Sequence, residues 1–144
     1  SAKLDPLLKL IQTAFSYMDG RISPPSSMHR LTIESIKEQC VKGEVWAIGV
    51  EPSACVFLKE RENCFYLGKL AVDEKYRGQG LARRLVEKAE ERGRARGHRI
   101  LELETRIELV ENHAAFQRMG FEKSGEGAHE GFDQPTWFAM RKSI

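Results

Sequence analysis

Apolar residues in the first third of the chain recur at the spacing of helices. Residues 6–18 show this period, and Asp5-Pro6 suits the start of that helix, with aspartate as N-cap and proline in the first turn. Gly20 ends it. A second helix is predicted from Thr32, as N-cap, to Gly43, with this apolar stripe: Ile33, Ile36, Cys40 and Val41.

Three strand-like runs follow without a helix between them. They cover residues 44–51, 54–60 and 64–72, and they are separated by the short polar links 52–53 and 61–63. Links this short join only antiparallel neighbours, so the three runs are predicted to form a meander.

The helical period returns over residues 80–96, where the buried stripe is predicted to be Leu81, Leu85, Val86 and Ala89. Gly97 ends this helix, and residues 100–105 read as a fourth strand. Because a helix separates this strand from residues 64–72, the two are predicted to be parallel and joined by a right-handed crossover.

The last third contains one short helix and two strands. The helix is predicted over residues 112–119, with Asn112 also suited to be its N-cap, and Phe121 closes the helix end by an apolar contact. Residues 121–129 and 136–142 are predicted to pair antiparallel. The element order ααβββαβαββ gives the α+β class, a mixed sheet covered by helices, in a single domain over residues 1–144.

Composition by itself excludes few classes of protein or binding partner. The chain has 144 residues, 41% hydrophobic composition and a formal net charge of +2, as expected for one globular domain with no strong bias towards charged partners. A basic stripe runs along the third helix and just beyond it, but Glu87, Glu90 and Glu91 interleave it and no aromatic residues accompany it. This favours a solvated helix face over nucleic-acid binding. The stripe consists of Arg83, Arg84, Lys88, Arg92, Arg94, Arg96 and Arg99.

The three cysteines, Cys40, Cys55 and Cys64, have no metal-binding spacing and are predicted to be buried or half-buried free thiols in a reducing compartment. No metal site is expected. No apolar run approaches the ~20 residues that span a membrane, and the start lacks a signal-peptide pattern. A cytoplasmic protein that does not contact membranes is therefore expected.

The most informative stretch is Leu67–Arg96, in which an apolar strand leads through Arg77-Gly78-Gln79-Gly80 directly into a helix. Such a turn directs several backbone N–H groups at one point, and the helix dipole adds positive potential there, so the turn suits a phosphate group. Two common phosphate motifs do not fit. The chain has no GxxxxGK[ST] run, and a dinucleotide fingerprint would need a small residue where Arg83 stands.

The six residues Arg77–Ala82 match the [QR]-x-x-G-x-[GA] signature of the GNAT superfamily of N-acetyltransferases. Leu70–Asp73 resembles the strand on which that family binds its cofactor. Asn112–Phe116 with Gly120-Phe121 resembles its second motif, N-x-x-A-x-x-x-x-G-F in outline. The resemblance covers about residues 44–142, and two motifs in order, separated by one helix and one strand, make it specific.

The resemblance implies a mostly antiparallel mixed sheet of six to seven strands flanked by about four helices. One parallel strand pair would splay around acetyl-CoA, with a distortion of the cofactor strand near Gly68. Pantetheine would pair with the strand backbone, the turn would hold the pyrophosphate, and a backbone N–H near Leu70 or Val72 would stabilise the oxyanion. The implied cofactor residues are Leu70, Ala71, Val72, Arg77, Gly78, Gln79, Gly80, Leu81, Ala82, Arg83, Asn112 and Phe116.

The implied reaction is direct attack of an amine on the thioester carbonyl. Many family members carry a tyrosine as general acid where this chain has Phe116, which has no proton to give. CoA thiolate is a fairly good leaving group, and the sequence does not say which group substitutes. Glu104 and His129 are candidates for the catalytic base, because an unperturbed histidine titrates near neutrality. Tyr66 and Glu34 are further candidates for the same role.

Three loops are expected to form the acceptor pocket: residues 21–30, 106–111 and 129–136, with Phe132, Trp137, Glu108 and Glu130 in or beside them. Acidic residues suit a cationic amine, whereas Arg21, Arg30 and Arg106 suit an acidic one. The acceptor therefore stays open between a small molecule and a peptide or protein amine.

Two other readings remain beside the enzyme. The first is a catalytically weak acyl-CoA-binding sensor, which Phe116 keeps open, and the second is a nucleic-acid binder that uses the basic helix. The sequence leaves open whether the chain forms a homodimer.

Overall fold

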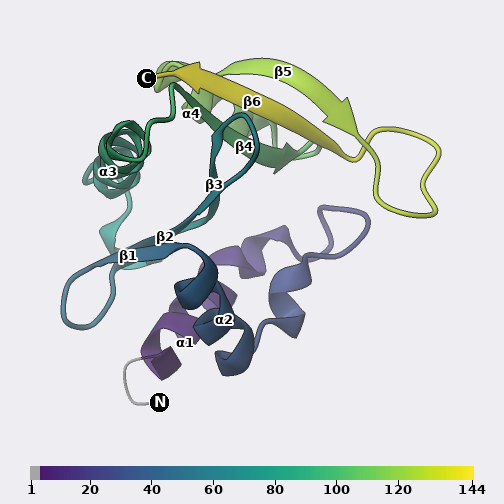
Figure 1. Cartoon of the computed structure of the whole chain (residues 1–144). Helices are drawn as coiled ribbons and strands as arrows, with labels where there is room; N and C mark the ends of the chain where they lie inside the picture. The colour runs from purple at the N-terminus through teal and green to yellow at the C-terminus, as the bar shows by residue number, and fades with distance from the viewer. Residues whose placement is uncertain (1–3) are drawn as a thin grey trace.

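The computed structural model describes residues 4–144 as one mixed sheet with helices on both faces (Figure 1). The strands lie in the order β1-β2-β3-β4-β6-β5, and only the β3–β4 pair is parallel. The α+β class and the mostly antiparallel mixed sheet are thus confirmed. The strands are β1 Glu44–Ile48, β2 Ala54–Glu60, β3 Phe65–Val72, β4 Ile100–Arg106, β5 Glu122–Gly127 and β6 Trp137–Ser143.

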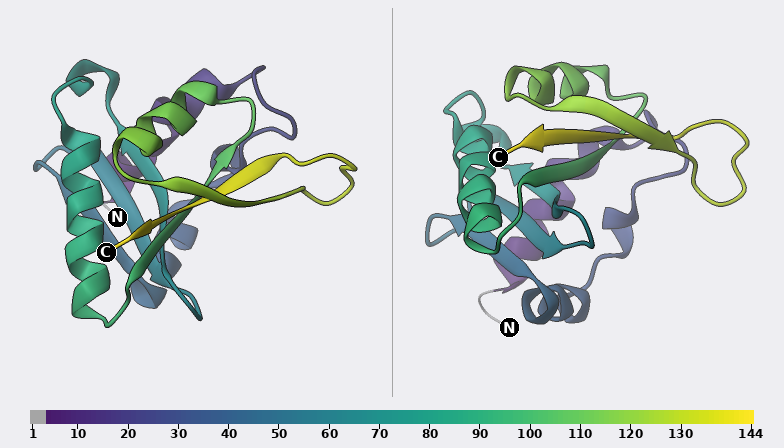
Figure 2. Two further views of the ribbon diagram at one scale, coloured as in Figure 1. Left: turned by 90° about the horizontal axis from the view of Figure 1, so that it is seen from above. Right: turned by 45° about the horizontal axis from the view of Figure 1, so that its top comes forward.

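Within residues 4–144, four α-helices flank this sheet, with three short 3-10 turns between elements. The helices are α1 Leu4–Phe15, α2 Ile33–Lys42, α3 Leu81–Ala95 and α4 Val110–Arg118. The 3-10 turns are η1 Ser16–Met18, η2 Ser27–Arg30 and η3 Glu74–Tyr76. Figures 1 and 2 show α1 and α2 on one side of the sheet and α3 on the other.

The element prediction was wrong at several boundaries. Asp5 is not an N-cap, because α1 already includes Leu4, and Pro6 is tolerated within the first turn, where its missing N–H has no partner to lose. The last turn of the predicted first helix tightens into η1, and the 21–30 loop contains η2. Helix α4 begins at Val110, so Asn112 lies inside its first turn and is not its cap. The remaining elements agree with prediction to within about three residues.

Helix α2 buries fewer apolar side chains than its sequence pattern indicates. Thr32 does cap it, in a reciprocal capping box with Ser35. Of the predicted apolar stripe, however, only Ile36 is fully buried, whereas Cys40 and Val41 face solvent. The expectation of a buried or half-buried thiol is therefore wrong for Cys40, because a short helix at the end of the sheet presents only a narrow face to it. It holds for Cys55 and Cys64.

Strand β2 is buried on both faces and separates the two halves of the core. Ala54, Val56 and Leu58 pack with Leu85 and Ala89 of α3. Cys55 and Phe57 face the other way, into a second cluster built on α1 and α2 that contains these residues: Leu7, Leu10, Ile11, Ala14 and Ile36. This explains why β2 reads as a continuous apolar run and not as an alternating one.

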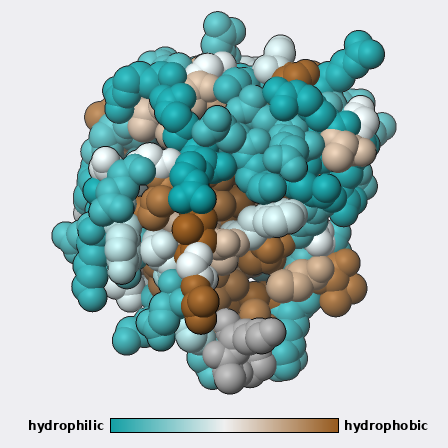
Figure 3. All heavy atoms as spheres, turned by 90° about the vertical axis from the view of Figure 1, so that its left-hand side faces the viewer, coloured by the Kyte–Doolittle hydropathy of each residue, from teal (hydrophilic) through white to brown (hydrophobic). Residues whose placement is uncertain are grey.

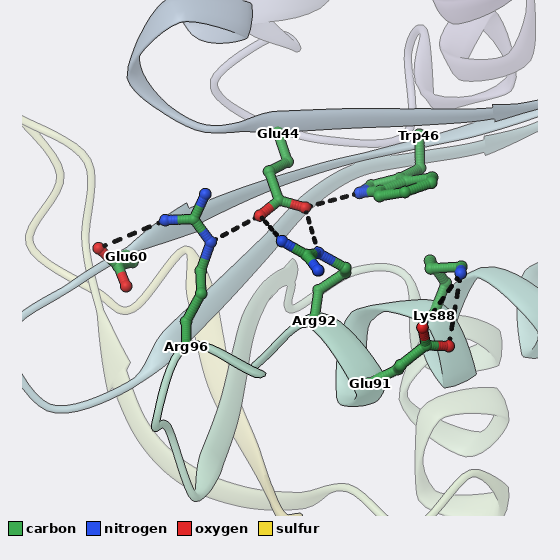
Figure 4. A network of polar contacts seen from close by, with 7 residues as sticks. All are labelled: Glu44, Trp46, Glu60, Lys88, Glu91, Arg92 and Arg96. Atoms are coloured by element: carbon green, nitrogen blue, oxygen red, sulfur yellow. Dashed lines mark hydrogen bonds and ion pairs between the residues drawn. The ribbon is translucent and has the colours of Figure 1, made fainter. Parts of the chain in front are cut away.

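Glu44 of β1 fastens helix α3 to the edge of the sheet (Figure 4). Its Oε1 accepts hydrogen bonds from Trp46 Nε1 and Arg92 Nε, both at 2.8 Å, and its Oε2 accepts from Arg96 Nε at 2.6 Å. The Glu44 side chain is only 13% exposed. These donors favour the ionised carboxylate and lower the pKa of Glu44 to about 2.

The same network shows what the basic stripe of α3 does. Arg92 and Arg96 are paired with Glu44, Arg94 lies 3.3 Å from Glu90, and Lys88 lies 3.4 Å from Glu91. Figure 3 shows the face that includes α3, where hydrophilic side chains cover the upper part and apolar ones show below them. Much of the positive charge of α3 is thus neutralised within the protein. Within residues 4–144, no helix is long and apolar enough to cross a membrane.

The Glu44 network predicts a pH-dependent contribution to stability. Glu44→Gln should lower the free energy of unfolding at pH 7 by roughly 2–3 kcal/mol, because one pKa unit corresponds to about 1.4 kcal/mol. The folded pKa lies below the ordinary 4.5, so this contribution is complete above pH 4.5 and is lost as the pH falls towards 2. Urea unfolding at pH 7, 5 and 3 measures it.

Glu91→Gln is the matched control, since Glu91 is 66% exposed and pairs only with Lys88. It should change the free energy of unfolding by less than about 0.5 kcal/mol at each pH. An equal loss in both variants, or a Glu44→Gln loss that does not shrink with acid, would contradict the assignment.

Candidate active site

A β-bulge in β3 creates the site. Phe57 of β2 faces Gly68, and Cys55 faces Ala71, so Val56 stands opposite two residues, Lys69 and Leu70. Lys69 adopts a positive φ of 49°, unusual for a residue with a side chain. The distortion lies one residue beyond the predicted Gly68.

The extra residue inverts the side-chain alternation of β3. Before the bulge, Phe65 and Leu67 face α3, whereas after it Leu70 packs on that side and Ala71 faces α1. A strand without a bulge would direct Ala71 to the same face as Leu67. The bulge therefore turns the end of β3 so that Leu70 can line the space beside α3.

β3 and β4 separate already before the bulge, after Tyr66. Their ladder consists of only two pairs, Phe65↔Leu101 and Tyr66↔Glu102, after which β4 pairs only with β6. The edge of β3 that faces β4 therefore presents backbone groups without a strand partner there. A cleft of about 440 Å³ opens between the two strands at their carboxyl ends, lined by residues 67–70 on one side and 103–106 on the other.

The glycine turn lies beside this cleft, at the start of α3. Gly78 and Gly80 both have positive φ angles, 80° and 78°, and Gly80 is the N-cap of α3. The first N–H groups of a helix have no partner within it, so this turn offers donors to an anion. Ala82 lines the cleft itself, whereas Leu81 is buried in the core and contributes only its backbone.

Helix α4 forms the opposite wall with Asn112, Ala115 and Phe116. Phe116 also meets Phe121 edge to face, with ring centroids 5.9 Å apart, and its carbonyl accepts a hydrogen bond from the Phe121 N–H. This is the predicted apolar closure of the helix end. Because Asn112 is not a cap, its side chain is available, and Nδ2 donates to Tyr17 Oη at 3.1 Å.

Glu104 and His129, the two leading base candidates, line the same cleft. His129 lies beyond β5, where its Nδ1 contacts the Thr136 hydroxyl and its N–H donates to the same oxygen. Burial and, secondly, the positive charge of Arg106 lower the pKa of His129. The imidazole is therefore biased towards its neutral form, which accepts protons.

Tyr66 also lines the cleft but is a poor base. Burial, reinforced by Glu104, raises the pKa of Tyr66 to about 12. The Arg61 guanidinium lies 3.7 Å from its ring centroid and also contacts Glu104, at 3.4 Å.

The three predicted acceptor loops meet at the mouth of the cleft, as Ser26–Met28, Arg106, Leu109 and His129 all line it. The loops after η1 and after β5 also lie at the same end of the molecule in Figures 1 and 2. Arg106 fixes the first of them, since its guanidinium donates to the carbonyls of Pro24 at 2.7 Å and Pro25 at 3.2 Å.

Trp137 lines the cleft, but several other residues predicted near the acceptor do not. Glu108 accepts from the Ser23 N–H at 3.0 Å, and Arg21 Nη2 donates to both carboxylate oxygens of Glu111, at 2.8 and 2.9 Å. Phe132 is 39% exposed on the β5–β6 loop.

Two of the predicted site residues, Glu34 and Arg83, do not line this cleft. Glu34 is on the exposed first turn of α2, paired with Lys37, and does not reach the cleft. Arg83 lines a different cavity, with Glu87 and Glu90 along α3. Within residues 4–144 no group of three His, Cys, Asp or Glu side chains is arranged to hold a metal ion.

Sequence reasoning missed Lys69 and Tyr17. Lys69 lines the cleft, donates to Gln39 Oε1 at 2.7 Å, and has a pKa lowered by burial. The sequence feature that could have indicated Lys69 is a lone lysine inside an apolar strand. Tyr17 lines the cleft from η1. The sequence feature that could have indicated it is an aromatic residue outside the apolar stripe of the predicted first helix.

Known structures share this architecture. The PaiA N-acetyltransferase of Thermoplasma acidophilum, solved with coenzyme A, superposes with a TM-score of 0.82 at 15% identity, over 99% of this chain and 94% of that one. The ribosomal-protein-S18-alanine N-acetyltransferase of Escherichia coli gives 0.70 at 18% identity, over 100% and 89%. A nourseothricin acetyltransferase gives 0.59 at 23% identity, over 65% of this chain and 58% of that one. At these sequence identities, the similarity is evidence for a shared fold alone.

No curated protein sequence matches the chain significantly. Against profiles of known families, however, residues 9–121 match the family described as acetyltransferase (GNAT). That match covers most of the chain, and it includes the glycine turn, the splayed strands and the α4 wall. The chain belongs to the GNAT acetyltransferase family.

Proposed function

We propose that this protein is an N-acetyltransferase that transfers an acetyl group from acetyl-CoA to a primary amine by direct attack in a ternary complex. The observation that carries the proposal is the cleft between β3 and β4, which opens after two strand pairs and adjoins the glycine turn at the start of α3. A relative of the same fold has been solved with coenzyme A.

Each part of acetyl-CoA has a group of suitable chemistry in this arrangement. The pyrophosphate would accept hydrogen bonds from backbone N–H groups of residues 77–82, at the positive end of α3. Pantetheine amides would pair with the open backbone of Leu70–Val72, which no strand covers on the β4 side. Asn112 and Phe116 would close the other wall.

The acceptor amine would approach from the loop side of the cleft, near Glu104 and His129. It must lose a proton before or during attack, and either side chain can accept one. A backbone N–H near Leu70 would stabilise the oxyanion that develops at the thioester carbonyl. We propose a small molecule or a peptide or protein amine as acceptor.

Phe116 favours a second candidate, a catalytically weak acyl-CoA sensor, because it carries no acidic proton. The two functions are separated by assaying CoA release from acetyl-CoA with polyamines, amino acids, and peptides with free N-termini or lysines. Turnover with any amine supports the enzyme. Tight acetyl-CoA binding without turnover across the panel supports the sensor.

Cofactor identity is tested by the thermal shift of the whole protein with acetyl-CoA, CoA, ATP or NAD. Ligand at 100 times its Kd stabilises the folded state by about 2.7 kcal/mol, so both CoA species should raise the Tm by several degrees. ATP and NAD should raise it less. The absence of a shift with either CoA species would overturn the proposal.

Gly80→Glu is predicted to abolish CoA binding, because it directs a carboxylate towards the anion position. Gly97→Glu is a matched control at the other end of α3. Both glycines have similar φ angles, 78° and 84°, and an added Cβ meets no atom within 4 Å at either. Both variants should therefore bear the same backbone strain, of order 1 kcal/mol. Equal CoA affinity in the two variants would show that the turn is only structural.

The base assignment predicts the titration of His129. Because burial and Arg106 lower its pKa, the His129 ring signals followed by NMR should titrate below pH 6.5. Arg106→Gln removes the nearby positive charge and should move this pKa upwards. A His129 pKa at or above 6.5 in the wild type, or no upward movement in the variant, would contradict the electrostatic account.

A further inference from the structure

Tyr17 of η1 lines the cleft, its hydroxyl is bound by Asn112 of the opposite wall, and the proposed reaction as described so far does not use it. Its side chain is also part of a neighbouring cavity of about 420 Å³, lined by Leu70–Val72, Arg77 and Asn112. Tyr17 is thus in contact with both spaces. It lies between the backbone proposed to hold pantetheine and the loops proposed to hold the acceptor.

A single hydrogen bond orients the phenol. Asn112 Nδ2 is a donor only, so at 3.1 Å the Tyr17 oxygen must accept this bond and its own proton is directed elsewhere. Asn112 and Phe116 are four residues apart on α4 and therefore lie on the same face of the helix. Cβ atoms at this spacing are about 5–6 Å apart. The phenolic oxygen is thus bound to a side chain that lies one helical turn before Phe116 in the α4 wall of the cleft.

Two guanidinium groups lie against the Tyr17 ring. The guanidinium carbons of Arg21 and Arg77 each lie 5.8 Å from the ring centroid. Glu111 is the acidic group that pairs with Arg21, whose Nη2 donates to both of its carboxylate oxygens. Asn112, the remaining contact from α4, is neutral. Two guanidinium groups against one paired carboxylate leave net positive charge beside the phenol.

The other tyrosine of the cleft is less suited to release a proton. Burial raises the pKa of Tyr66 to about 12, and Glu104 acts in the same direction. His129 has its Nδ1 engaged by Thr136 and lies on the acceptor side, where a base is needed.

We propose that Tyr17 is the proton donor to the leaving thiolate. This inference rests on the proposed acetyl transfer. The amine nitrogen forms a bond to the thioester carbonyl carbon, the carbon–sulfur bond breaks, and its electron pair goes to sulfur. Sulfur takes the Tyr17 proton and leaves as the CoA thiol. The excess proton of the amine goes to the base, and the phenolate regains a proton from solvent.

Tyr17→Phe removes the hydroxyl and keeps the ring that packs between the two arginines. General acid catalysis contributes ~10²–10⁴-fold, so kcat should fall by at least about 100-fold with the best amine of the panel. The Kd for acetyl-CoA, measured by calorimetry, should change by less than about threefold. Tyr76→Phe is the matched control, on an exposed side chain that lines neither cavity, and should retain wild-type kcat.

The pH profile separates proton donation from a positioning role. In the wild type, kcat should fall on the alkaline side as the donor loses its proton, and this limb should be absent from Tyr17→Phe. If Tyr17 only positions Asn112, the variant would instead lose affinity for acetyl-CoA and keep its kcat. That result, or the same alkaline limb in Tyr17→Phe as in the wild type, would overturn the assignment.

The proposed function and the role of Tyr17 are overturned by different results. Absence of CoA binding and of turnover in the wild-type protein would overturn the proposed function. Wild-type turnover combined with a Tyr17→Phe kcat within threefold of it would leave that function standing and overturn the role of Tyr17.

Discussion

The separation of β3 from β4 is the constraint on which the rest of the structure depends. Parallel strands normally continue their ladder, because unpaired backbone groups in a protein interior are costly. Here the ladder stops after Tyr66↔Glu102, while β3 keeps its pairing with β2 and β4 keeps its pairing with β6. The sheet stays intact on both outer sides, and the opening between them leaves polar backbone exposed in the cleft.

The bulge at Lys69 and Leu70 makes this separation compatible with a packed core. A strand that simply bent away would carry its side chains to the wrong faces, whereas one extra residue restores Leu70 to the α3 side and turns Ala71 to α1. Lys69 bears the unfavourable φ angle. Strain of this kind persists only where the surroundings hold it, and here β2 and α1 hold both ends of the bulge.

Polar contacts between segments far apart in sequence join the walls of the cleft. Arg106 holds the prolines of the 21–30 loop, Arg21 binds Glu111, and Asn112 binds Tyr17 across 95 positions of the chain. Together they join η1 and the following loop to β4 and α4. These contacts make the two walls of the cleft parts of one connected structure, which is why Tyr17, near the start of the chain, lines the same cleft as residues of β4 and α4.

The sequence by itself determined what depends on local rules: the helical and strand periods, the parallel crossover, and the glycine turn at Gly78 and Gly80. Positive φ and a helix start are encoded within a few residues, so the glycine turn and the start of α3 could be predicted. Only the tertiary structure decided which polar side chains meet. It brought Tyr17 to the cleft and left Glu34 outside, because the direction of a side chain follows from strand splay and from helix packing over long sequence distances, which no local pattern records.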